Sequence, residues 1–502
     1  MSLWRKKSIT KLLADAESNE HGLKKTLTAT SLVALGIGAI IGAGLFVRTA
    51  AAASEHAGNA VTISFLIAAV GCLFAGLCYA EFASMIPIAG SAYTYAYTTM
   101  GELVAWIIGW ALVLEYALGA ATVSIAWSEY LNKLTATEAH PMGAITYTLC
   151  HSPFEVSTSG EHGIINLPAL FILLILSLLL IRGTAESARV NTIIVFVKVS
   201  IVLVFIAVGW HFINPANHTP YIIPDNAKPV DLGNGKVFDY AGSARSHGWG
   251  GILSGAAVVF FAFIGFDAVS TAAQETKNPK RDMPIGILGS LAVCTVLYIL
   301  FAHVLTGVAP FTDFLRAGKE ASVSYAIDMY MHMHWLATLV TVAILAGFSS
   351  VILVMLLGQS RVFYSMSNDG LLPKIFSDLH PKFRTPYKSN IILFVFVGFF
   401  GAFIPESVAG DLTSIGTLLA FILVCLGIII MRKADPDRAR PFRTPLVPLV
   451  PILGILVCGA MVCSEDPVTI VTALGWMAFG LIIFFAYSRH HSTIGKENLP
   501  SN

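Results

Sequence analysis

The chain has 502 residues, of which 56% are hydrophobic and only 12% charged, and its mean hydropathy is +0.74. A soluble globule of this length needs more surface charge, so the composition excludes that class and predicts a membrane protein. The net charge of +1 shows no bias toward nucleic acid or acidic partners, and the charges lie almost entirely between apolar runs.

Twelve apolar runs are candidates for membrane spans, since roughly 20 apolar residues cross the ~30 Å hydrocarbon core as a helix. The first six lie near 30–50, 60–86, 101–131, 165–182, 190–213 and 249–272. The other six lie near 283–309, 323–357, 389–404, 408–431, 445–463 and 467–488. Residues 1–29 precede them as a polar, basic segment, and 489–502 follow as a tail. The first run reaches spanning length, so we expect an uncleaved anchor.

Lys and Arg are unevenly distributed over the segments that join these runs. If the N-terminus is inside the cell, 23 of the 31 Lys and Arg residues fall in cytoplasmic segments and seven fall outside. Because such residues are retained on the cytoplasmic side, we predict a multi-pass protein of the inner or plasma membrane with both termini in the cytoplasm. The remaining residue, Lys198, lies inside an apolar run.

The first and sixth runs are interrupted by glycine near their centres. GIGAIIGAG, from Gly36 to Gly44, has four glycines in nine residues, and FFAFIGFDAVS contains Gly265 and Asp267. Glycine favours a break in a helix, although in the first run a close-packing helix face is an equal alternative. The interrupted runs begin two sets of five, 30–213 and 249–431, as in an inverted repeat that binds its substrate between the halves. Residues 445–488 add two helices.

A broken helix exposes amide groups on one side of the break and carbonyl groups on the other, which suits a zwitterion. We expect its carboxylate to bind the amides of Gly42, Ala43 and Gly44. Its ammonium group would bind carbonyls at Ile40, Phe261, Ala262 and Ile264. A nucleotide-binding glycine loop is excluded, because it requires a preceding strand. No hydrolase or ATPase motif occurs, so we predict no enzyme activity, cofactor or metal.

Three ionisable residues lie deep in the runs. A lysine at the centre of a span costs roughly 2.5–3.5 kcal/mol on insertion scales, so Lys198 must face protein or water. It serves either proton coupling or a fixed ion pair with a buried carboxylate. Glu115 and Asp267 either line the substrate cavity or make structural hydrogen bonds, and Asp267 could cap freed amides. Residues nearer the ends of runs are interpreted as interfacial: Glu81, Glu102 and Glu129.

The long connections 132–164 and 214–248 are predicted to be external and to form ordered loops or short surface helices. Their histidines lack metal-ligand spacing and are interpreted as ordinary surface residues: His140, His151 and His162. The seven cysteines show no disulfide pattern, and Cys150 has no obvious partner in its loop. The loops that contain RDMP, RVFYSMSNDG and RARPFRTP are predicted to form cytoplasmic surface and gate structure, with charge retention as the alternative.

Four motifs together resemble the amino acid, polyamine and organocation superfamily, specifically its bacterial permeases of the cationic amino acid transporter type. They are GIGAIIGAGLFV, PIAGSAYTYAY, FFAFIGFDAVSTAAQETKNPKRDMPIGI and RVFYSMSNDGLLPKIFSDLHPKFRTP, and the resemblance covers nearly the whole chain. It implies an all-α polytopic membrane protein with twelve transmembrane helices. These form a LeuT-like five-plus-five inverted repeat with helices 1 and 6 discontinuous, plus two extra helices, and work by alternating access.

The resemblance also implies roles for individual residues. Lys198 would couple transport to protons by contacting the first helix, and Glu115 and Asp267 would lie near the pocket for the substrate side chain. Ala43 stands where many relatives have threonine or serine. Phe348 makes the wall of the substrate pocket bulky. We therefore expect symport of a proton with a cationic or small neutral amino acid. Amino acid exchange and a nontransporting sensor are the alternatives, and the sequence does not identify a small membrane subunit.

Overall fold

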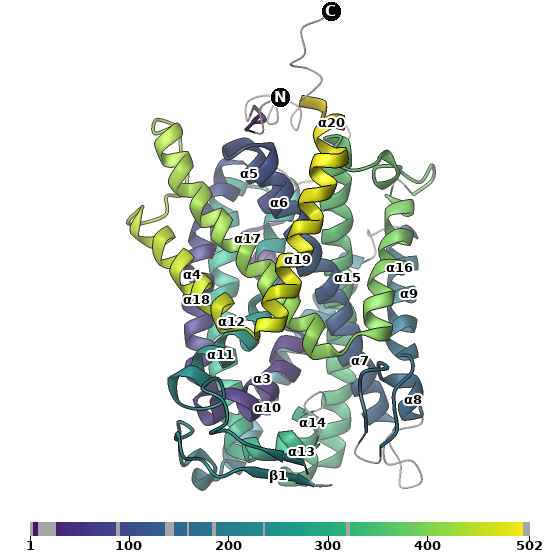
Figure 1. The fold of residues 1–502 in the computed structure, drawn as a ribbon, viewed down its shortest axis with the longest axis vertical. Coiled ribbons are helices and arrows are strands. Elements are labelled where there is room, and N and C mark those ends of the chain that lie inside the picture. The colour runs from purple at the N-terminus through teal and green to yellow at the C-terminus, as the bar shows by residue number, and fades with distance from the viewer. Residues whose placement is uncertain are drawn as a thin grey trace, which may run out of the picture.

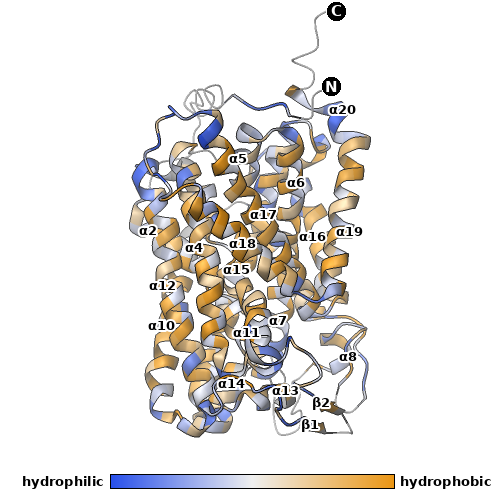
Figure 2. Cartoon of the chain, turned by 60° about the vertical axis from the view of Figure 1, so that its left-hand side comes forward, coloured by the Kyte–Doolittle hydropathy of each residue, from blue (hydrophilic) through white to orange (hydrophobic). Residues whose placement is uncertain are grey.

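Helices dominate the computed structural model, and they run mainly along its long axis (Figure 1). Hydrophobic residues cover their middle portions, whereas hydrophilic residues gather toward the two ends (Figure 2). The end that carries α5 and α20 is called the upper end below, and the end that carries β1 the lower end. The structure describes residues 4–8, 27–86, 91–135, 145–157, 160–182, 187–233, 236–317, 322–383 and 385–494. His140 lies outside these residues.

Every predicted run contains helix. The first set comprises α2 (Ala29–Ile40), α3 (Thr49–Ala52), α4 (Val61–Met85), α6 (Glu102–Val113), α7 (Gly119–Leu134), α9 (Leu167–Arg182) and α10 (Ser187–Gly209). The second comprises α11 (Gly248–Phe260), α12 (Pro279–Val308), α15 (His334–Asn368), α16 (Tyr387–Phe403) and α17 (Glu406–Ala434). After them come α18 (Leu449–Ser464) and α19 (Pro467–Ile483). Among the described residues, eight helical segments are long and apolar enough to cross a membrane, and four apolar helices are shorter.

Shorter elements join the long helices. At the upper end are α5 (Ser91–Thr99) and α20 (Arg489–His491), and at the lower end α8 (Tyr147–Cys150), α13 (Phe314–Ala317) and α14 (Ser322–Ala326) (Figure 1). Strands β1 (Val230–Gly233) and β2 (Lys236–Phe238) pair in antiparallel fashion within the 214–248 connection. This hairpin was not predicted. Cysteines are free throughout the described residues, as the sequence indicated.

Two helix assignments differ from the prediction. The eighth run was expected to begin near 323, but α15 begins at His334, because His332 adopts a left-handed conformation with φ 54° and ends the preceding turn. The segment Ser91–Thr99 lies between the second and third predicted runs, yet it forms the buried helix α5. Its tyrosines pack against neighbouring rings, with Tyr95 stacked on Phe82 at 5.2 Å. Aromatic packing therefore buries a helix too polar to be recognised as a span.

The core surrounds the interrupted helices. Helix α12 packs against both α2 and α4, and α11 packs against α4. Phe65 on α4 contacts Tyr298 on α12 at 5.5 Å and Phe263 at 6.3 Å between ring centroids. Helices α9 and α16 pack together at the right edge of Figure 1. The first and sixth runs are thereby enclosed by other helices, which allows irregular backbone within the hydrophobic layer.

The carboxylates interpreted as interfacial do lie near helix ends, but they are paired within the protein. Glu81 is fully buried and pairs with Arg432 and Arg440. Glu102 begins α6 and accepts a hydrogen bond of 2.8 Å from Ser492 Oγ. Glu129 lies near the end of α7. These residues thus connect segments that are far apart in the sequence.

His151 corrects the prediction of ordinary surface histidines. Its Nε2 lies 2.8 Å from Glu129 Oε1, and the His151 ring stacks on Tyr147 at 3.7 Å. Burial alone would lower the pKa of His151, but hydrogen bonds with Cys150 and Glu129 outweigh it and raise that pKa to about 11. The charged imidazole therefore fixes the 145–157 segment to α7. His162, by contrast, is exposed as expected.

Candidate functional site

The first helix breaks where the sequence predicts. Helix α2 ends at Ile40, Ile41 is extended with φ −71° and ψ 108°, and a π-helical turn, Gly44–Arg48, begins three residues later. Leu45 N donates to Gly42 O at 3.1 Å, which starts the new helical segment. The amides of residues 42–44 precede the first bond of that segment, so they have no acceptor within it. This leaves an amide-rich helix start beside a carbonyl-rich helix end.

The second break is also confirmed. Helix α11 ends at Phe260 and tightens into a 3-10 turn, Phe261–Phe263, after which Ile264 is extended with ψ 137°. Gly265 then has φ 108°, a conformation that glycine adopts far more readily than other residues. A second 3-10 segment, Asp267–Glu275, follows. Gly265 therefore permits the turn that separates the two halves of this helix.

The two breaks lie against each other. A Cβ atom placed on Gly44 would be 2.2 Å from the Cα of Ala262, so only glycine allows this approach. On the other side, a Cβ on Gly265 would be 3.1 Å from the carbonyl oxygen of Ala39. The two breaks thus meet at one place in the fold, although they are more than 200 residues apart in the chain.

The carbonyl groups freed at the end of α2 have specific partners. Lys198 on α10 donates from Nζ to Gly38 O at 2.6 Å and to Ile41 O at 3.0 Å. The Tyr298 hydroxyl lies 3.0 Å from Ile40 O and 2.9 Å from Ala262 O, so the two carbonyls share its single hydrogen. An ammonium group at a helix C-terminus is favoured by the helix dipole as well as by these bonds. Two cationic or polar donors therefore replace the missing next turn of α2.

Lys198 is 1% exposed and has no carboxylate partner among the residues that the structure describes. The ion pair considered from the sequence is therefore wrong. Its aliphatic chain lies against Gly347 on α15, where an added Cβ would be 2.7 Å from Lys198 Cδ. The absence of a side chain at Gly347 makes room for the lysine to reach α2. The single charge is consequently held by backbone carbonyls alone.

The two deep carboxylates lie together beside the second break. Asp267 Oδ2 accepts hydrogen bonds from Tyr116 Oη at 2.5 Å and from Ser91 Oγ at 3.4 Å. Glu115 is close enough for the charges of the two carboxyl groups to interact, and both residues are 0% exposed. No carboxylate–cation pair involving either is found within the described part of the chain. The two carboxyl groups therefore retain oxygen atoms that can accept a proton or bind a cationic group.

The remaining predicted residues line the same region. Ala43 and Phe348 are both fully buried. Phe348 contacts Phe46, which belongs to the first break, at 6.2 Å, and Tyr130 at 5.5 Å between ring centroids. The predicted substrate-binding residues are all buried, so the breaks are closed to solvent in this structure. The Phe348 ring thus packs against the segment that follows the first break.

Two contributors were not identified from the sequence. Tyr298 is a polar residue in the apolar run VLYILF, a signal that could have indicated it. Arg48 lies near the end of the first apolar run, yet it is 2% exposed and forms an ion pair with Glu406 at 3.4 Å and another with Asp411. Its guanidinium also lies 5.9 Å from the centre of the Phe261 ring. Arg48 therefore joins both breaks to α17.

Comparison with known proteins agrees with this geometry. The sequence profile of a family described as amino acid permease matches residues 27–490. The chain is 44% identical to the branched-chain amino acid permease BcaP of Bacillus subtilis over 99% of both chains. It is 38% identical to the methylthioribose transporter of the same organism, over 99% of this chain and 100% of the relative. Cationic amino acid transporter 4 of Arabidopsis thaliana, a vacuolar protein, is 34% identical over 87% of this chain and 68% of its own. The chain is a multi-pass membrane transport protein and belongs to the amino acid permease family.

Proposed function

We propose that the protein carries an amino acid together with a proton by alternating access at the two breaks. The observation that carries this proposal is the bonding of Lys198. Its buried ammonium group donates to two carbonyl groups at the end of α2 and has no carboxylate partner among the described residues. Protonation of this single side chain therefore decides how firmly the first helix is held, which is what a proton-coupled step requires.

The coupling follows from the donor count of the amine. The ammonium form has three N–H donors and a positive charge, whereas the neutral amine has two donors and no charge. Loss of the proton weakens both the hydrogen bonds to α2 and the attraction to its dipole. Segment Ala29–Ile40 then becomes free to move away from α10. Release of the proton to the cytoplasm would thus accompany opening of the first helix on that side.

The substrate is placed by the backbone groups at the breaks. Its carboxylate would bind the amides of residues 42–44, and its ammonium group the carbonyls of Ile40 and Ala262, in place of the Tyr298 hydroxyl. The wall formed by Phe46 and Phe348 suits an aliphatic side chain. We therefore favour small or branched neutral amino acids, in line with the branched-chain permease among the relatives. The Glu115–Asp267 site keeps a cationic amino acid as the second candidate.

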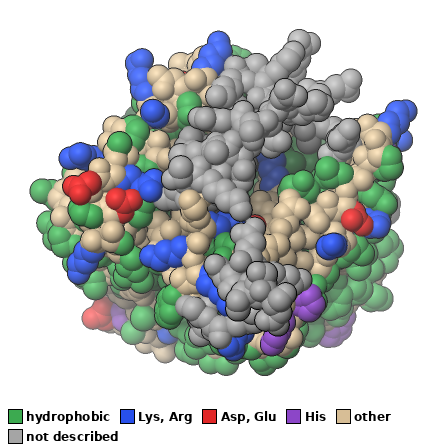
Figure 3. All heavy atoms as spheres, turned by 90° about the horizontal axis from the view of Figure 1, so that it is seen from above, with side chains coloured by type: hydrophobic (Ala, Val, Ile, Leu, Met, Phe, Trp, Pro, Cys, Tyr) green, Lys and Arg blue, Asp and Glu red, His purple; other side chains and the backbone are tan. Residues whose placement is uncertain are grey.

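The same proposal assigns the upper end to the cytoplasm and the chain to twelve spans in two inverted sets of five, 30–213 and 249–431. Seen from above, Lys and Arg side chains are spread over the upper face and exceed Asp and Glu there (Figure 3). This distribution favours retention of the upper end inside the cell. Chemical labelling of single cysteines introduced at Lys374 and at Val237 tests it, since only the second should react in intact cells.

Transport and proton coupling can be tested with one reconstitution. Purified protein in sodium-free liposomes should accumulate labelled alanine or leucine when an inward proton gradient is applied, and collapse of the gradient should stop it. Arginine accumulation instead would identify a cationic substrate. Uptake only with an amino acid trapped inside would favour the exchange alternative. Binding without any transport would favour the sensor.

The place of the substrate ammonium group can be tested with Tyr298→Phe. The variant leaves two buried carbonyls without a donor, so its unfolding free energy should fall by about 1–3 kcal/mol. A bound ammonium group would supply the missing hydrogen bonds. We therefore expect the transported amino acid to raise the melting temperature of Tyr298→Phe more than that of the wild type.

A matched control is Tyr130→Phe, because the buried Tyr130 hydroxyl also donates to a carbonyl, Phe46 O, at 3.1 Å. That carbonyl is not expected to bind the ammonium group. The added stabilisation by substrate should therefore be specific to Tyr298→Phe. An equal thermal shift in both variants would place the ammonium group elsewhere.

A further inference from the structure

A surface cavity separates the start of α12 from the connection between α17 and α18. Its volume is about 620 Å³. Lys280 and Arg281 line it on the α12 side, and Pro441 and Phe442 on the other. No residue of either helix break lines it, and no step of the transport proposal uses it.

The polar part of the cavity is cationic. Lys280 and Arg281 are exposed, and within the described residues neither forms an ion pair or a hydrogen bond through its side chain. Asp282 follows them on α12, but no ion pair with either is present. Arg443, two residues beyond Pro441, is also exposed, and its side chain forms no ion pair or hydrogen bond with the described residues. The cavity therefore has the charge to bind an anion.

The rest of the lining is apolar and continues along α12. Pro284, Ile285 and Leu288 extend the cavity away from the two cations, toward the hydrophobic middle of the bundle. Ile285 is 42% exposed, and further along the same face Val293 and Val296 are also exposed. Residues at these intervals share one side of a helix. An anionic group at the cations thus adjoins an apolar surface that runs into the bilayer.

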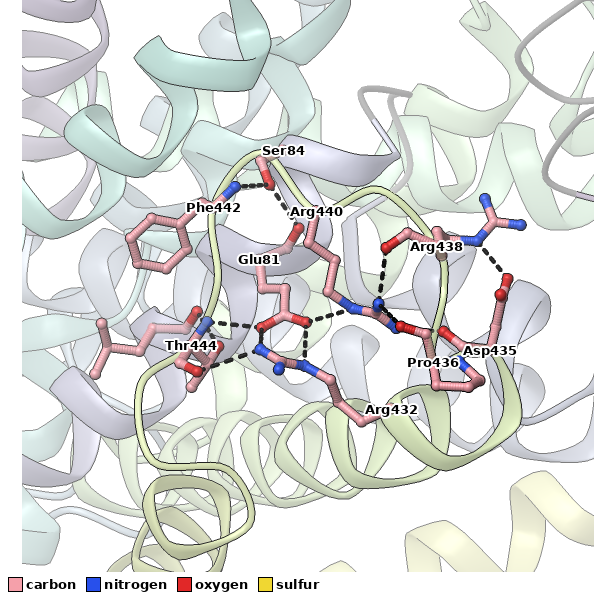
Figure 4. Close-up of polar contacts among 10 residues, drawn as sticks. Glu81, Ser84, Arg432, Asp435, Pro436, Arg438, Arg440, Phe442 and Thr444 are labelled. Carbon is pink, nitrogen blue, oxygen red and sulfur yellow. Dashed lines mark hydrogen bonds and ion pairs between the residues drawn. The ribbon is translucent and has the colours of Figure 1, made fainter.

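The opposite wall is held in place by a buried ion cluster (Figure 4). Glu81 on α4 accepts hydrogen bonds from Arg432 Nε at 2.9 Å and Nη2 at 2.8 Å, and from Thr444 N at 2.7 Å. Arg440 Nε lies 3.2 Å from Glu81 Oε1. The two arginines exceed the one carboxylate, so the cluster adds no negative charge beside the cavity.

The cluster also fixes the residue that faces the cavity. Phe442 N donates to Ser84 Oγ at 3.3 Å, and Arg440 Nη1 donates to Pro436 O at 2.9 Å and Arg438 O at 2.8 Å. These bonds fold the 435–444 segment back on α4, with Phe442 held between the anchored residues Arg440 and Thr444 (Figure 4). The cavity is consequently bounded by anchored backbone on one side and by a long helix on the other.

We propose that this cavity binds an anionic phospholipid of the leaflet at the upper end. Lys280 and Arg281 would contact the phosphate, and an acyl chain would lie along Ile285, Leu288 and the exposed valines of α12. A soluble anion would use the cations but leave the apolar part unused. Two cations that pair with none of the described residues lie beside an exposed apolar stripe, and this combination selects a ligand that has both an anionic and an apolar part.

Binding can be measured with a phosphatidylglycerol that carries a fluorescent acyl chain, added to purified full-length protein in a neutral detergent. The Lys280→Gln/Arg281→Gln variant should bind it about 30-fold more weakly, given about one kcal/mol for each basic residue. The control, Lys374→Gln/Lys382→Gln, removes two exposed cations at the same end but outside the cavity. It should retain wild-type affinity. Equal loss in both variants would show charge attraction without a site and overturn the proposal.

Competition experiments distinguish the lipid from other ligands. Unlabelled phosphatidylglycerol should displace the probe, whereas phosphatidylcholine and soluble glycerol phosphate should compete far more weakly. Competition by glycerol phosphate at the lipid's concentration would assign the cavity to soluble anions instead.

A photoactivatable phosphatidylglycerol gives a readout on the unmutated protein. Its adducts should map to residues 278–289 and 441–442, and their absence there would contradict the site whatever the variants do. Transport activity enters none of these measurements, so the proposal stands or falls separately from proton coupling.

Discussion

Lys198→Ala should abolish proton-driven accumulation of amino acid in liposomes, reducing it to the level of protein-free vesicles. The ammonium group is the one side chain bonded to both Gly38 O and Ile41 O, so its removal breaks the connection between protonation and α2. Binding should persist, because the proposed substrate contacts are made by backbone groups at the breaks and not by Lys198. A substrate-induced rise in melting temperature measures that binding.

The matched substitution for this prediction is Lys198→Met, which keeps most of the buried aliphatic volume beside Gly347 but has no charge or donor. If the role of Lys198 is coupling, Lys198→Met and Lys198→Ala should behave alike in accumulation. Recovery of gradient-driven accumulation in Lys198→Met would assign the lysine a packing role. Exchange of labelled for unlabelled substrate, measured without a gradient, should survive in both variants.

The helix breaks could be predicted because the signal is local. Four of the nine residues of GIGAIIGAG are glycines, which have no side chain. Gly265 lies two residues before Asp267 in an apolar run. Both patterns lower the free-energy cost of a non-helical backbone, and this effect depends only on residues within the segment. Their positions at the start of two sets of five runs then suggested that they meet. The observed contact between Gly44 and Ala262 agrees with that suggestion.

The partners of those breaks could not be predicted in the same way, because they depend on long-range packing. The single Lys198 in an apolar run indicates only that the lysine faces protein or water. It does not distinguish an ion pair with a buried carboxylate from hydrogen bonds to backbone carbonyls. Tyr298 lies 258 residues from Ile40, its acceptor. Glu81 appeared interfacial from its place near the end of a run, yet it is enclosed because the distant 435–444 segment folds over it. The charge count alone could not reveal these pairings.

Gly44→Ala should abolish substrate binding and lower the stability of the protein by about 1–3 kcal/mol, a typical effect of overpacking. The new Cβ would lie 2.2 Å from Ala262 Cα and 2.6 Å from Ala262 N. These are backbone atoms of the second break, which cannot turn aside as a flexible side chain can. The two breaks must therefore separate, and the proposed amide and carbonyl sites would no longer face one zwitterion. Substrate-induced thermal shift measures the loss.

Gly42→Ala provides the comparison, because it changes the same break in the same chemical way. Its Cβ would meet only the Val351 side chain, with Cγ2 at 3.1 Å, which can yield by a small rotation. Gly475→Ala on α19, where nothing lies within 4 Å, should be neutral. Binding should therefore decrease in the order Gly475→Ala, Gly42→Ala, Gly44→Ala. Gly44→Ala binding as well as Gly42→Ala would mean that the substrate does not depend on contact between the two breaks, and the site would have to be sought away from them.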